Sequence, residues 1–555
     1  MSVSLSHVAA SPNPYPSVRL PVFARNVVST SHPLAAQAGL HMLRLGGNAV
    51  DAAIATAAVM TIVEPVSNGL GSDAFALVWD GQDLHGLNAS GRAPQAWTSA
   101  YFQAKQGDAA LSPPKRGMDS VTVPGMVSGW VALSERFGRL PFADVMQPAI
   151  EVAERGYLIP PVVQSKWAAA ADELKSQPGF AEVFLPWGRA PRVGEHFRMP
   201  AAARALQAIA RTKGAAFYEG EIAQALVRFA QAQGGALSLA DLSAHHADWV
   251  TPIQQSYRGY DVHEIPPNGQ GIAALIALGL LSHWDVAEHA PDSVPAQHLQ
   301  IEAMKLAFAD VYRYVADPAA MSLTAADLLD PAYLRERARL IDPTRAQAPQ
   351  AGTPHDAHRR GGTIYLTAAD EQGMMVSLIQ SNYMGFGSGC VEPTYGISLQ
   401  NRGHGFALPA SRVNPANWVA PGKRPFHTII PAFLSRPLSN GGIDPVMSFG
   451  VMGANMQPQG HLQTLVRLLD FGQSLQAACD APRWRFNTGL SVNVEAGMPA
   501  ATVAGLRALG HEVEVLHDPY QEFGAGQFIW RMGDPAVEGY VAASDPRRDG
   551  LAAGW

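Results

Sequence analysis

The chain has 555 residues, of which 47% are hydrophobic and 16% are charged, and this composition is typical of a globular protein with a large core rather than of a disordered one. The formal net charge of -7 and the lack of any polybasic tract argue against a nucleic-acid partner. The two cysteines, Cys390 and Cys479, provide neither a disulfide framework nor a zinc-binding spacing, so we expect no metal or other cofactor.

The N-terminal region, residues 1–25, is rich in proline and serine, and we expect it to be a mobile segment. It lacks the basic start and the continuous apolar stretch of a signal peptide. The apolar run at residues 49–63 is shorter than the roughly 18 residues of a membrane span, and it contains Asp51. We therefore expect a soluble, cytoplasmic protein without a membrane partner.

Helices are predicted through most of the first two thirds of the chain. Pro33 suits the first turn of one helix, and Asn48 can cap the next, which is almost wholly apolar and should be buried on most sides. The glycine-rich turn at residues 68–73 lacks the Lys-Ser/Thr of a phosphate loop. The predicted helices are 34–45, 49–62, 126–156, 200–232, one that ends at Leu281, and 298–314, and the predicted strands are 26–30, 74–79 and 257–265.

The pattern changes to strands after residue 362. Residues 340–362, just before the change, are polar, rich in Pro, Gly, Arg and His, and typical of an exposed linker in which a peptide bond can be reached and cleaved. The strands predicted after it are 363–368, 374–380, 396–400, 446–450, 527–531 and 539–543, with helices at 461–469 and 475–478.

The junction between Gly362 and Thr363 joins this linker to the first of those strands. If the peptide bond breaks there, Thr363 becomes a new N-terminus that carries a hydroxyl nucleophile and, as its α-amine, a general base on the same residue. A glycine-threonine pair before a strand is common, so this dipeptide alone does not establish catalysis.

A set of short motifs runs through nearly the whole chain in a fixed order. The motifs are His32-Pro33-Leu34-Ala35, Gly46-Gly47-Asn48-Ala49-Val50-Asp51-Ala52-Ala53, Glu64-Pro65, Gly69-Leu70-Gly71, Val123-Pro124-Gly125, Leu140-Pro141-Phe142, Gln147-Pro148-Ala149-Ile150, Tyr257-Arg258-Gly259-Tyr260, Glu302-Ala303-Met304-Lys305, Phe386-Gly387-Ser388-Gly389, Pro421-Gly422-Lys423-Arg424-Pro425, Asp480-Ala481-Pro482-Arg483 and Ser544-Asp545-Pro546-Arg547. No one of them is specific, but together they resemble the γ-glutamyltransferase family of N-terminal nucleophile hydrolases.

The resemblance implies an α+β fold, a four-layer αββα sandwich, and autocatalytic cleavage of a precursor into two chains. The family's nucleophilic threonine aligns with Thr363, so cleavage is expected between Gly362 and Thr363. After the segment 1–25, residues 26–362 would form a helix-rich large chain and 363–555 a strand-rich small chain of one αββα unit. The two chains would be each other's partners, and a homo-oligomer is left open.

The resemblance also implies roles around the new N-terminus. Thr363 is expected to be the nucleophile, with its α-amine as base. Ser381 falls where the family has a supporting hydroxyl, although a strand serine facing solvent would look the same in sequence. The N–H groups of Gly453 and Ala454 fall where the family stabilises the oxyanion of the tetrahedral intermediate, and the alternative there is an ordinary strand-to-helix turn.

The predicted substrate pocket departs from the family pattern. Where γ-glutamyl enzymes hold the substrate's α-ammonium with an acid, this chain has Gly405, and Arg402 replaces a neutral amide. His427 and Thr428 stand in place of a serine pair, and Tyr383 in place of an asparagine. Because a cation cannot hold an ammonium group, we expect the pocket to favour an anion.

Arg92 is a further candidate for substrate binding. A gap-free match puts Ser90 at the position of the family's carboxylate-binding arginine, so Arg92 either reaches the site by a different turn or is an exposed loop residue. A guanidinium binds a carboxylate bidentately, and these departures together suggest a small acid amide without an α-amino group. Residues 380–389 and 400–403 resemble the oxamate amidohydrolase-like branch of the family.

We therefore expect a self-processing amidohydrolase that hydrolyses a small, carboxylate-bearing, oxamate-like amide through an acyl-threonine intermediate. One alternative is a glutathione hydrolase or γ-glutamyltransferase with a divergent pocket, and another is an inactive scaffold of the same fold. Retention of Thr363, Gly453 and the Pro-Gly-Lys-Arg-Pro segment disfavours the scaffold. The sequence has neither a Gly-x-Ser-x-Gly elbow nor a His-Glu-x-x-His motif, which argues against a conventional serine hydrolase and a zinc hydrolase.

Overall fold

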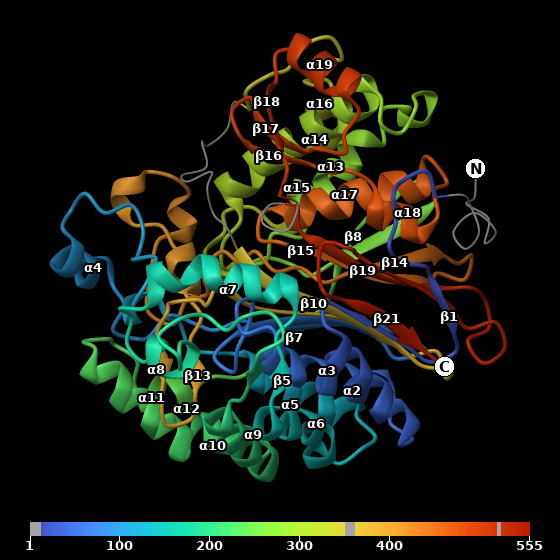
Figure 1. Ribbon diagram of the computed structural model, residues 1–555. Coiled ribbons are helices and arrows are strands. Elements are labelled where there is room, and N and C mark those ends of the chain that lie inside the picture. The colour runs from blue at the N-terminus through green and yellow to red at the C-terminus, as the bar shows by residue number, and fades with distance from the viewer. Residues whose placement is uncertain (1–12, 350–360, 519–522) are drawn as a thin grey trace.

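Two seven-stranded sheets lie face to face at the centre of the computed structural model, and helices cover the outer face of each sheet (Figure 1). The structure describes residues 13–349, 361–518 and 523–555. The four layers form the α+β, αββα sandwich that the sequence analysis predicts. None of the helices in the described ranges is long and apolar enough to cross a membrane.

Neighbouring strands in both sheets are antiparallel. Sheet 1 has the order β21 (Leu551–Gly554), β2 (Val27–Thr30), β10 (Gly361–Ala369), β11 (Met375–Met384), β3 (Asp73–Trp79), β4 (Leu84–Ala89), β7 (Asp248–Val250). Sheet 2 has the order β1 (Val22–Ala24), β20 (Tyr540–Ser544), β19 (Ala525–Arg531), β15 (Ile443–Met452), β14 (Ala432–Pro437), β9 (Tyr260–Glu264), β8 (Ile253–Tyr257).

The two outer layers are helical. Sheet 1 is covered by α2 (Pro33–Arg44), α3 (Ala49–Val63), α5 (Met126–Phe137) and α6 (Phe142–Arg155), with α9 (Pro200–Thr212), α10 (Ala215–Tyr218) and α11 (Glu221–Ala232) further out. Sheet 2 is covered by α13 (Ile272–Leu281), α14 (Val294–Tyr314), α17 (Met456–Leu469) and α18 (Leu475–Asp480).

The remaining helices and strands lie outside the two large sheets. The remaining α-helices are α4 (Ser99–Gln106), α7 (Pro161–Leu174), α8 (Phe180–Phe184), α12 (Leu239–Ser243), α15 (Ala325–Leu328), α16 (Pro331–Ala338) and α19 (Ala500–Ala508). The remaining strands are β5 (Tyr157–Leu158), β6 (His196–Phe197), β12 (Val391–Glu392), β13 (Ile397–Ser398), β16 (Trp484–Thr488), β17 (Ser491–Glu495) and β18 (Glu512–Leu516).

The sequence of α3 explains both where the helix begins and why it is buried. Asn48 caps it by accepting hydrogen bonds from the N–H groups of Val50 and Asp51, and Asp51 completes a capping box. All of its 15 residues are buried, as the apolar run predicts. Asp370, in the turn between β10 and β11, also accepts a hydrogen bond from the N–H of Ala49 at 2.8 Å, which fixes the helix to the sheet.

Strand β10 alternates between two cores. Its even-numbered residues Ile364, Leu366 and Ala368 pack under the helices of sheet 1. Tyr365 and Ala369 pack in the core between the two sheets. This period of two is that of a strand buried on both faces, and it places the odd-numbered side chains of β10 between the sheets.

Several predictions differ from the structure. The helical region predicted at 126–156 is two helices, α5 and α6, and the one predicted at 200–232 is three, α9, α10 and α11. The predicted strand 257–265 is a hairpin of β8 and β9, because Arg258 (φ 51°) and Gly259 (φ 84°) take the left-handed conformations that a two-residue hairpin turn requires. The predicted N-terminal segment 1–25 includes β1, which pairs with β20 and is therefore part of sheet 2. Much of the predicted linker 340–362 lies outside the described residues.

Candidate active site

Three polar side chains lie in a row across adjacent strands at one end of sheet 1. Thr363 on β10 is next to Ser381 on β11, and Ser381 pairs in register with Asp73 on β3. Two residues further along these strands, Tyr365, Ile379 and Phe75 belong to the core between the sheets. Because side chains alternate along a strand, the row faces that same space and is buried there.

Thr363 stands at an irregularity in the pairing of β10 with β11. Gly362 pairs with Tyr383 and Ile364 with Gln380, so Thr363 faces two residues of the neighbouring strand. Its hydroxyl lies 3.0 Å from the Ser381 hydroxyl, which also accepts the N–H of Tyr383 at 2.8 Å. Ser381 is fully buried, so it is not the solvent-facing serine that the sequence allowed as an alternative.

Asp73 forms a buried pair with His427. The Nε2 of His427 lies 3.2 Å from Asp73 Oδ2, and the N–H groups of Gly91 and Gly125 donate to Asp73 Oδ1. Burial raises the pKa of the Asp73 carboxyl to about 6, although Arg402 nearby opposes the shift. Burial, with Arg402 adding repulsion, holds the pKa of His427 well below its ordinary value, so the imidazole is neutral.

Arg402, Tyr383 and Thr428 lie together, as the sequence predicts for the substrate pocket. The guanidinium of Arg402 stacks on the Tyr383 ring at 4.0 Å from its centroid and donates from Nη1 to the Thr428 hydroxyl at 2.8 Å. Arg402 is fully buried. Tyr383 has a φ of 77°, which is uncommon for a non-glycine residue and marks a backbone that its surroundings hold in place.

The turn at Gly453 and Ala454 comes from sheet 2 and lies at the same end. Across the gap between the sheets, Thr367 contacts Ser448 at 2.6 Å and the Tyr365 ring covers Gly450, where a Cβ would come within 2.5 Å of it. Continuing this series by two residues on each strand brings Thr363 level with Met452, directly before Gly453. The N–H groups of Gly453 and Ala454 donate to no group in the part of the chain that the structure describes.

Gln270 fastens this turn to the pocket, a role that sequence reasoning missed. Its side-chain amide donates to the carbonyl of Thr428 at 2.6 Å and to that of Ala454 at 2.9 Å. Its backbone N–H also donates to the carbonyl of His427 at 2.9 Å. The loop 266–271, with the sequence Pro-Pro-Asn-Gly-Gln-Gly, therefore contacts both the 427–428 segment and the turn at Gly453 and Ala454.

Arg92 is not brought to the other predicted residues by any contact within the described ranges. Its guanidinium donates to Asp248 on β7 at 3.0 Å. Arg424, from the Pro-Gly-Lys-Arg-Pro motif, shares Asp248 and donates from Nε to the carbonyl of Ser90 at 3.0 Å. A buried arginine thus lies at Ser90, but it comes from a different loop from the one that sequence reasoning considered.

The chain matches the family described as Gamma-glutamyltranspeptidase over residues 35–555. The chain belongs to this family. The Oxamate amidohydrolase proenzyme of Klebsiella pneumoniae is 36% identical to it over 536 residues, which cover 94% of this chain and 97% of the relative. The Glutathione hydrolase-like YwrD proenzyme of Bacillus subtilis is 34% identical over 544 residues, which cover 96% and 98%. A crystal structure of cephalosporin acylase from Bacillus halodurans has a TM-score of 0.90 and 46% identity, and the match covers 98% of this chain and 99% of that one.

Family membership confirms the predicted resemblance and fold class, and it makes the chain a self-processing enzyme of the amidohydrolase or γ-glutamyltranspeptidase type. The names of the three relatives point to three different substrates, so similarity alone does not choose among them.

Gly405, at the predicted position of the ammonium-binding acid, is enclosed by backbone. A Cβ built there would come within 2.8 Å of the Phe426 carbonyl oxygen, closer than real Cβ atoms approach. An acidic side chain therefore cannot be added at this position without moving the 425–426 segment. The difference from the γ-glutamyl enzymes at this position is therefore not only a missing carboxylate, because the backbone at Phe426 leaves no space for a side chain.

One group of side chains in the described ranges has ligand atoms spaced as in a metal site: His298, Glu302 and His511. A hydrogen-bond chain already accounts for them. Lys305 Nζ lies 2.7 Å from Glu302 and 3.3 Å from His511 Nδ1, and His511 Nε2 lies 2.8 Å from His298 Nδ1. The lysine ammonium supplies a positive charge beside Glu302 and His511.

Proposed function

We propose that the protein is a self-processing amidohydrolase that hydrolyses a small, carboxylate-bearing amide through an acyl-threonine intermediate at Thr363, with oxamate as the test substrate. The observation that carries the proposal is the Thr363 hydroxyl, 3.0 Å from Ser381 on the neighbouring central strand and directly after Gly362. Family membership and the similarity to an oxamate amidohydrolase support it.

Processing would use the same hydroxyl that later performs catalysis. The Thr363 oxygen attacks the carbonyl carbon of Gly362 and the peptide C–N bond breaks. The nitrogen of Thr363 takes up the proton that the hydroxyl loses. Water then hydrolyses the resulting ester, which leaves a carboxylate on Gly362 and a new α-amine on Thr363. The hydroxyl of Ser381 is placed to exchange a hydrogen bond with the attacking oxygen throughout.

Turnover would follow the same course on an external amide. The α-amine, whose ordinary pKa of about 7.7–8.0 leaves it partly unprotonated at neutral pH, accepts the Thr363 hydroxyl proton as the oxygen attacks the amide carbon. That proton passes to the leaving nitrogen, and ammonia departs from a primary amide. Water, deprotonated by the same amine, hydrolyses the acyl ester to the acid and restores the hydroxyl.

Stabilisation of the tetrahedral oxyanion is assigned to the N–H groups of Gly453 and Ala454. They lie one and two residues beyond Met452, the residue that the register of the facing strands brings level with Thr363, and they donate to nothing in the described chain. An N–H that lacks a protein partner is a donor available to a developing negative charge. The αL conformation of Ala454 (φ 51°) directs the backbone at this turn.

Substrate recognition is assigned to Arg402, Tyr383, His427 and Thr428. Arg402 is a buried cation whose plane is fixed by the Tyr383 ring and by Thr428, which suits a bidentate contact with a carboxylate. The same cation, with Gly405 closed to an acid, disfavours an α-ammonium. Arg92 is assigned a supporting role at Asp248, where it shares the carboxylate with Arg424.

The second candidate, hydrolysis or transfer of γ-glutamyl groups, is supported by the similarity to a glutathione hydrolase-like relative. The deciding experiment measures ammonia release from oxamate and turnover of a chromogenic γ-glutamyl anilide by the same preparation. We expect oxamate hydrolysis and little anilide turnover. Anilide turnover with no oxamate hydrolysis would replace the proposal with the γ-glutamyl alternative.

The inactive-scaffold alternative is tested by gel electrophoresis of the purified protein. Two bands near the masses of residues 1–362 and 363–555 support processing. A single band at 59.0 kDa in a preparation with no amidase activity supports the scaffold.

A further inference from the structure

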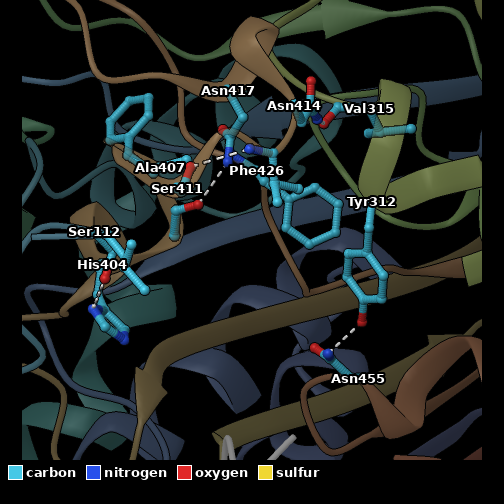
Figure 2. Close-up of a pocket in the computed structure, with 14 residues that line it drawn as sticks. Ser112, Tyr312, Val315, His404, Ala407, Ser411, Asn414, Asn417, Phe426 and Asn455 are labelled. Carbon is cyan, nitrogen blue, oxygen red and sulfur yellow. Dashed lines mark hydrogen bonds between the residues drawn. The ribbon is translucent and has the colours of Figure 1, made fainter. Parts of the chain in front are cut away.

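A cavity of about 350 Å³ lies between α14 and the segment 404–417 (Figure 2). Figure 2 shows Tyr312, Val315 and Phe426 on one side of it and His404 with Ser112 on the other. Cavities of this size hold small organic molecules and bury most of their surface. Oxamate is far too small to fill it.

The cavity wall includes residues that lie within two positions of proposed site residues at three places in the sequence. His404 follows Arg402 by two residues, Phe426 directly precedes His427, and Asn455 directly follows Ala454. Each of these three segments therefore carries both a predicted site residue and a residue of the cavity wall. The Gln270 amide ties two of these segments together through the carbonyls of Thr428 and Ala454.

The cavity offers a ligand mainly apolar and aromatic surface. No Asp, Glu, Lys or Arg is among the described residues that line it. Its asparagines are engaged in building the wall: Asn417 bonds to Gly405 and Phe426, Asn414 donates to the Val315 carbonyl at 2.8 Å, and Asn455 donates to the Tyr312 hydroxyl. The rings of Tyr312 and Phe426 lie 5.9 Å apart between centroids and form an aromatic wall.

We infer that the cavity binds a bulky apolar group on the acyl side of the scissile amide, so that the preferred substrates are carboxylate-bearing amides whose acyl part carries an aromatic or comparably large apolar substituent. The inference rests on the proposed function. The acyl side is chosen because the wall 404–407 continues the segment that begins at Arg402, so a group in the cavity and a carboxylate on Arg402 belong to the same part of the substrate.

The test uses two primary amides that share ammonia as leaving group: malonamate and 2-benzylmalonamate. The benzyl group adds one apolar substituent to the acyl part and leaves the carboxylate and the amide unchanged. Burying a group of this size is worth roughly ten- to a hundredfold in binding. We expect kcat/KM for the benzyl compound to exceed that for malonamate by about tenfold or more.

A cavity-filling variant gives the structural control. Val413→Phe places a ring in the cavity from a partly buried loop position, and we expect it to remove the preference for the benzyl amide. Val537→Phe adds the same ring at a valine that is 76% exposed and lies outside the cavity, and we expect the preference to persist. Two-band processing and thermal melting of each variant show that it has folded.

Binding of the product acids keeps the inference separate from the proposed function. Calorimetry on the processed enzyme should give tighter binding of 2-benzylmalonate than of malonate by about tenfold or more, and Val413→Phe should abolish the difference. Equal affinities overturn the inference whether or not any amide is hydrolysed. If oxamate is hydrolysed and the benzyl compound is not preferred, the proposed function stands and the inference about the cavity fails. If the benzyl compound is preferred and oxamate is not hydrolysed, the inference stands and oxamate is no longer the model substrate.

Discussion

Thr363 combines features that a structural threonine in a central strand has no need of. Its side chain faces the interior between the sheets, as do those of Tyr365, Thr367 and Ala369 on the same face of the strand. The strand pairing shifts at this residue, and its hydroxyl meets a second buried hydroxyl, that of Ser381. Thr367 on the same face makes a comparable buried hydroxyl pair with Ser448 at 2.6 Å, so what distinguishes Thr363 is the shift in strand pairing and its position directly after Gly362.

The Ser381 hydroxyl is predicted to support both processing and turnover. Ser381→Ala removes the partner of Thr363 and the acceptor for the Tyr383 N–H, so we expect slower processing and a fall in kcat of about tenfold to a hundredfold. Time courses on gels and initial rates measure both effects. Ser377→Ala is the matched control, because Ser377 is buried on the same face of β11 and bonds to the Tyr365 hydroxyl at 2.7 Å. If both variants process and turn over alike, Ser381 has only a structural role.

Asp73 is predicted to make stability fall as pH rises from about 4 to about 6. Its pKa is about 6 in the folded protein against an ordinary 3.8, so between these values the folded state binds more protons than the unfolded state. The free energy of unfolding should then decrease with rising pH, by on the order of 3 kcal/mol from this group. Urea unfolding of Thr363→Ala with and without Asp73→Asn, between pH 4 and 7, isolates it. Parallel pH profiles for the two proteins would contradict the assignment.

At the scale of elements, the site is assembled where a loop, a turn and a strand end are tied together by one side chain. The loop 266–271 pairs with the 427–428 segment through its backbone. Gln270 then extends to the Ala454 carbonyl. The turn at Gly453 and Ala454 is in this way held in position against the segment that carries Thr428.

Loss of the Gln270 amide is predicted to lower kcat by about tenfold, because two carbonyls lose their common donor and the turn at Gly453 loses its support. Steady-state kinetics of Gln270→Leu should show the effect in kcat more than in KM. Gln463→Leu is a suitable comparison, since Gln463 is also buried and also donates to two carbonyls, those of Gln459 and Trp484, on the outer side of sheet 2. An equal loss of kcat in both variants would assign the effect to general destabilisation.

Sequence periodicity and capping located most elements but not the contacts that build the site. The apolar run of α3 and its Asn48 cap are local signals, and both are seen in the structure. Asp73 is the last residue of the glycine-rich stretch 68–73 and the first residue of β3, but its partner His427 is 354 residues away along the chain. Gln270 and Arg424 likewise act through non-local contacts. Arg424 lies in the Pro-Gly-Lys-Arg-Pro motif. That motif was the one sequence signal that could have indicated a buried arginine near Ser90.

At the scale of the whole molecule, the two predicted chains share both sheets. In sheet 1, the small-chain strands β10 and β11 lie between β2 and β3 of the large chain. In sheet 2, β15 and β14 of the small chain continue into β9 and β8 of the large chain. Cleavage at residue 362 therefore cuts one connection and leaves two cores that both chains build.

The processed chains are consequently predicted to stay together in native buffer. Gel filtration followed by denaturing gels should show both chains in one peak, at equal amounts, and separation only in strong denaturant, because each chain alone would expose the inner faces of both sheets. Separation of the chains in native buffer with retained activity would contradict this arrangement of shared sheets.

The central claim is that residue 363 becomes the N-terminus of the active enzyme. N-terminal sequencing of the smaller chain from fully active material tests it most directly. We predict Thr-Ile-Tyr-Leu, the residues from Thr363 to Leu366, and no smaller chain at all from Thr363→Ala. Any other N-terminal sequence in material of full activity would contradict the account.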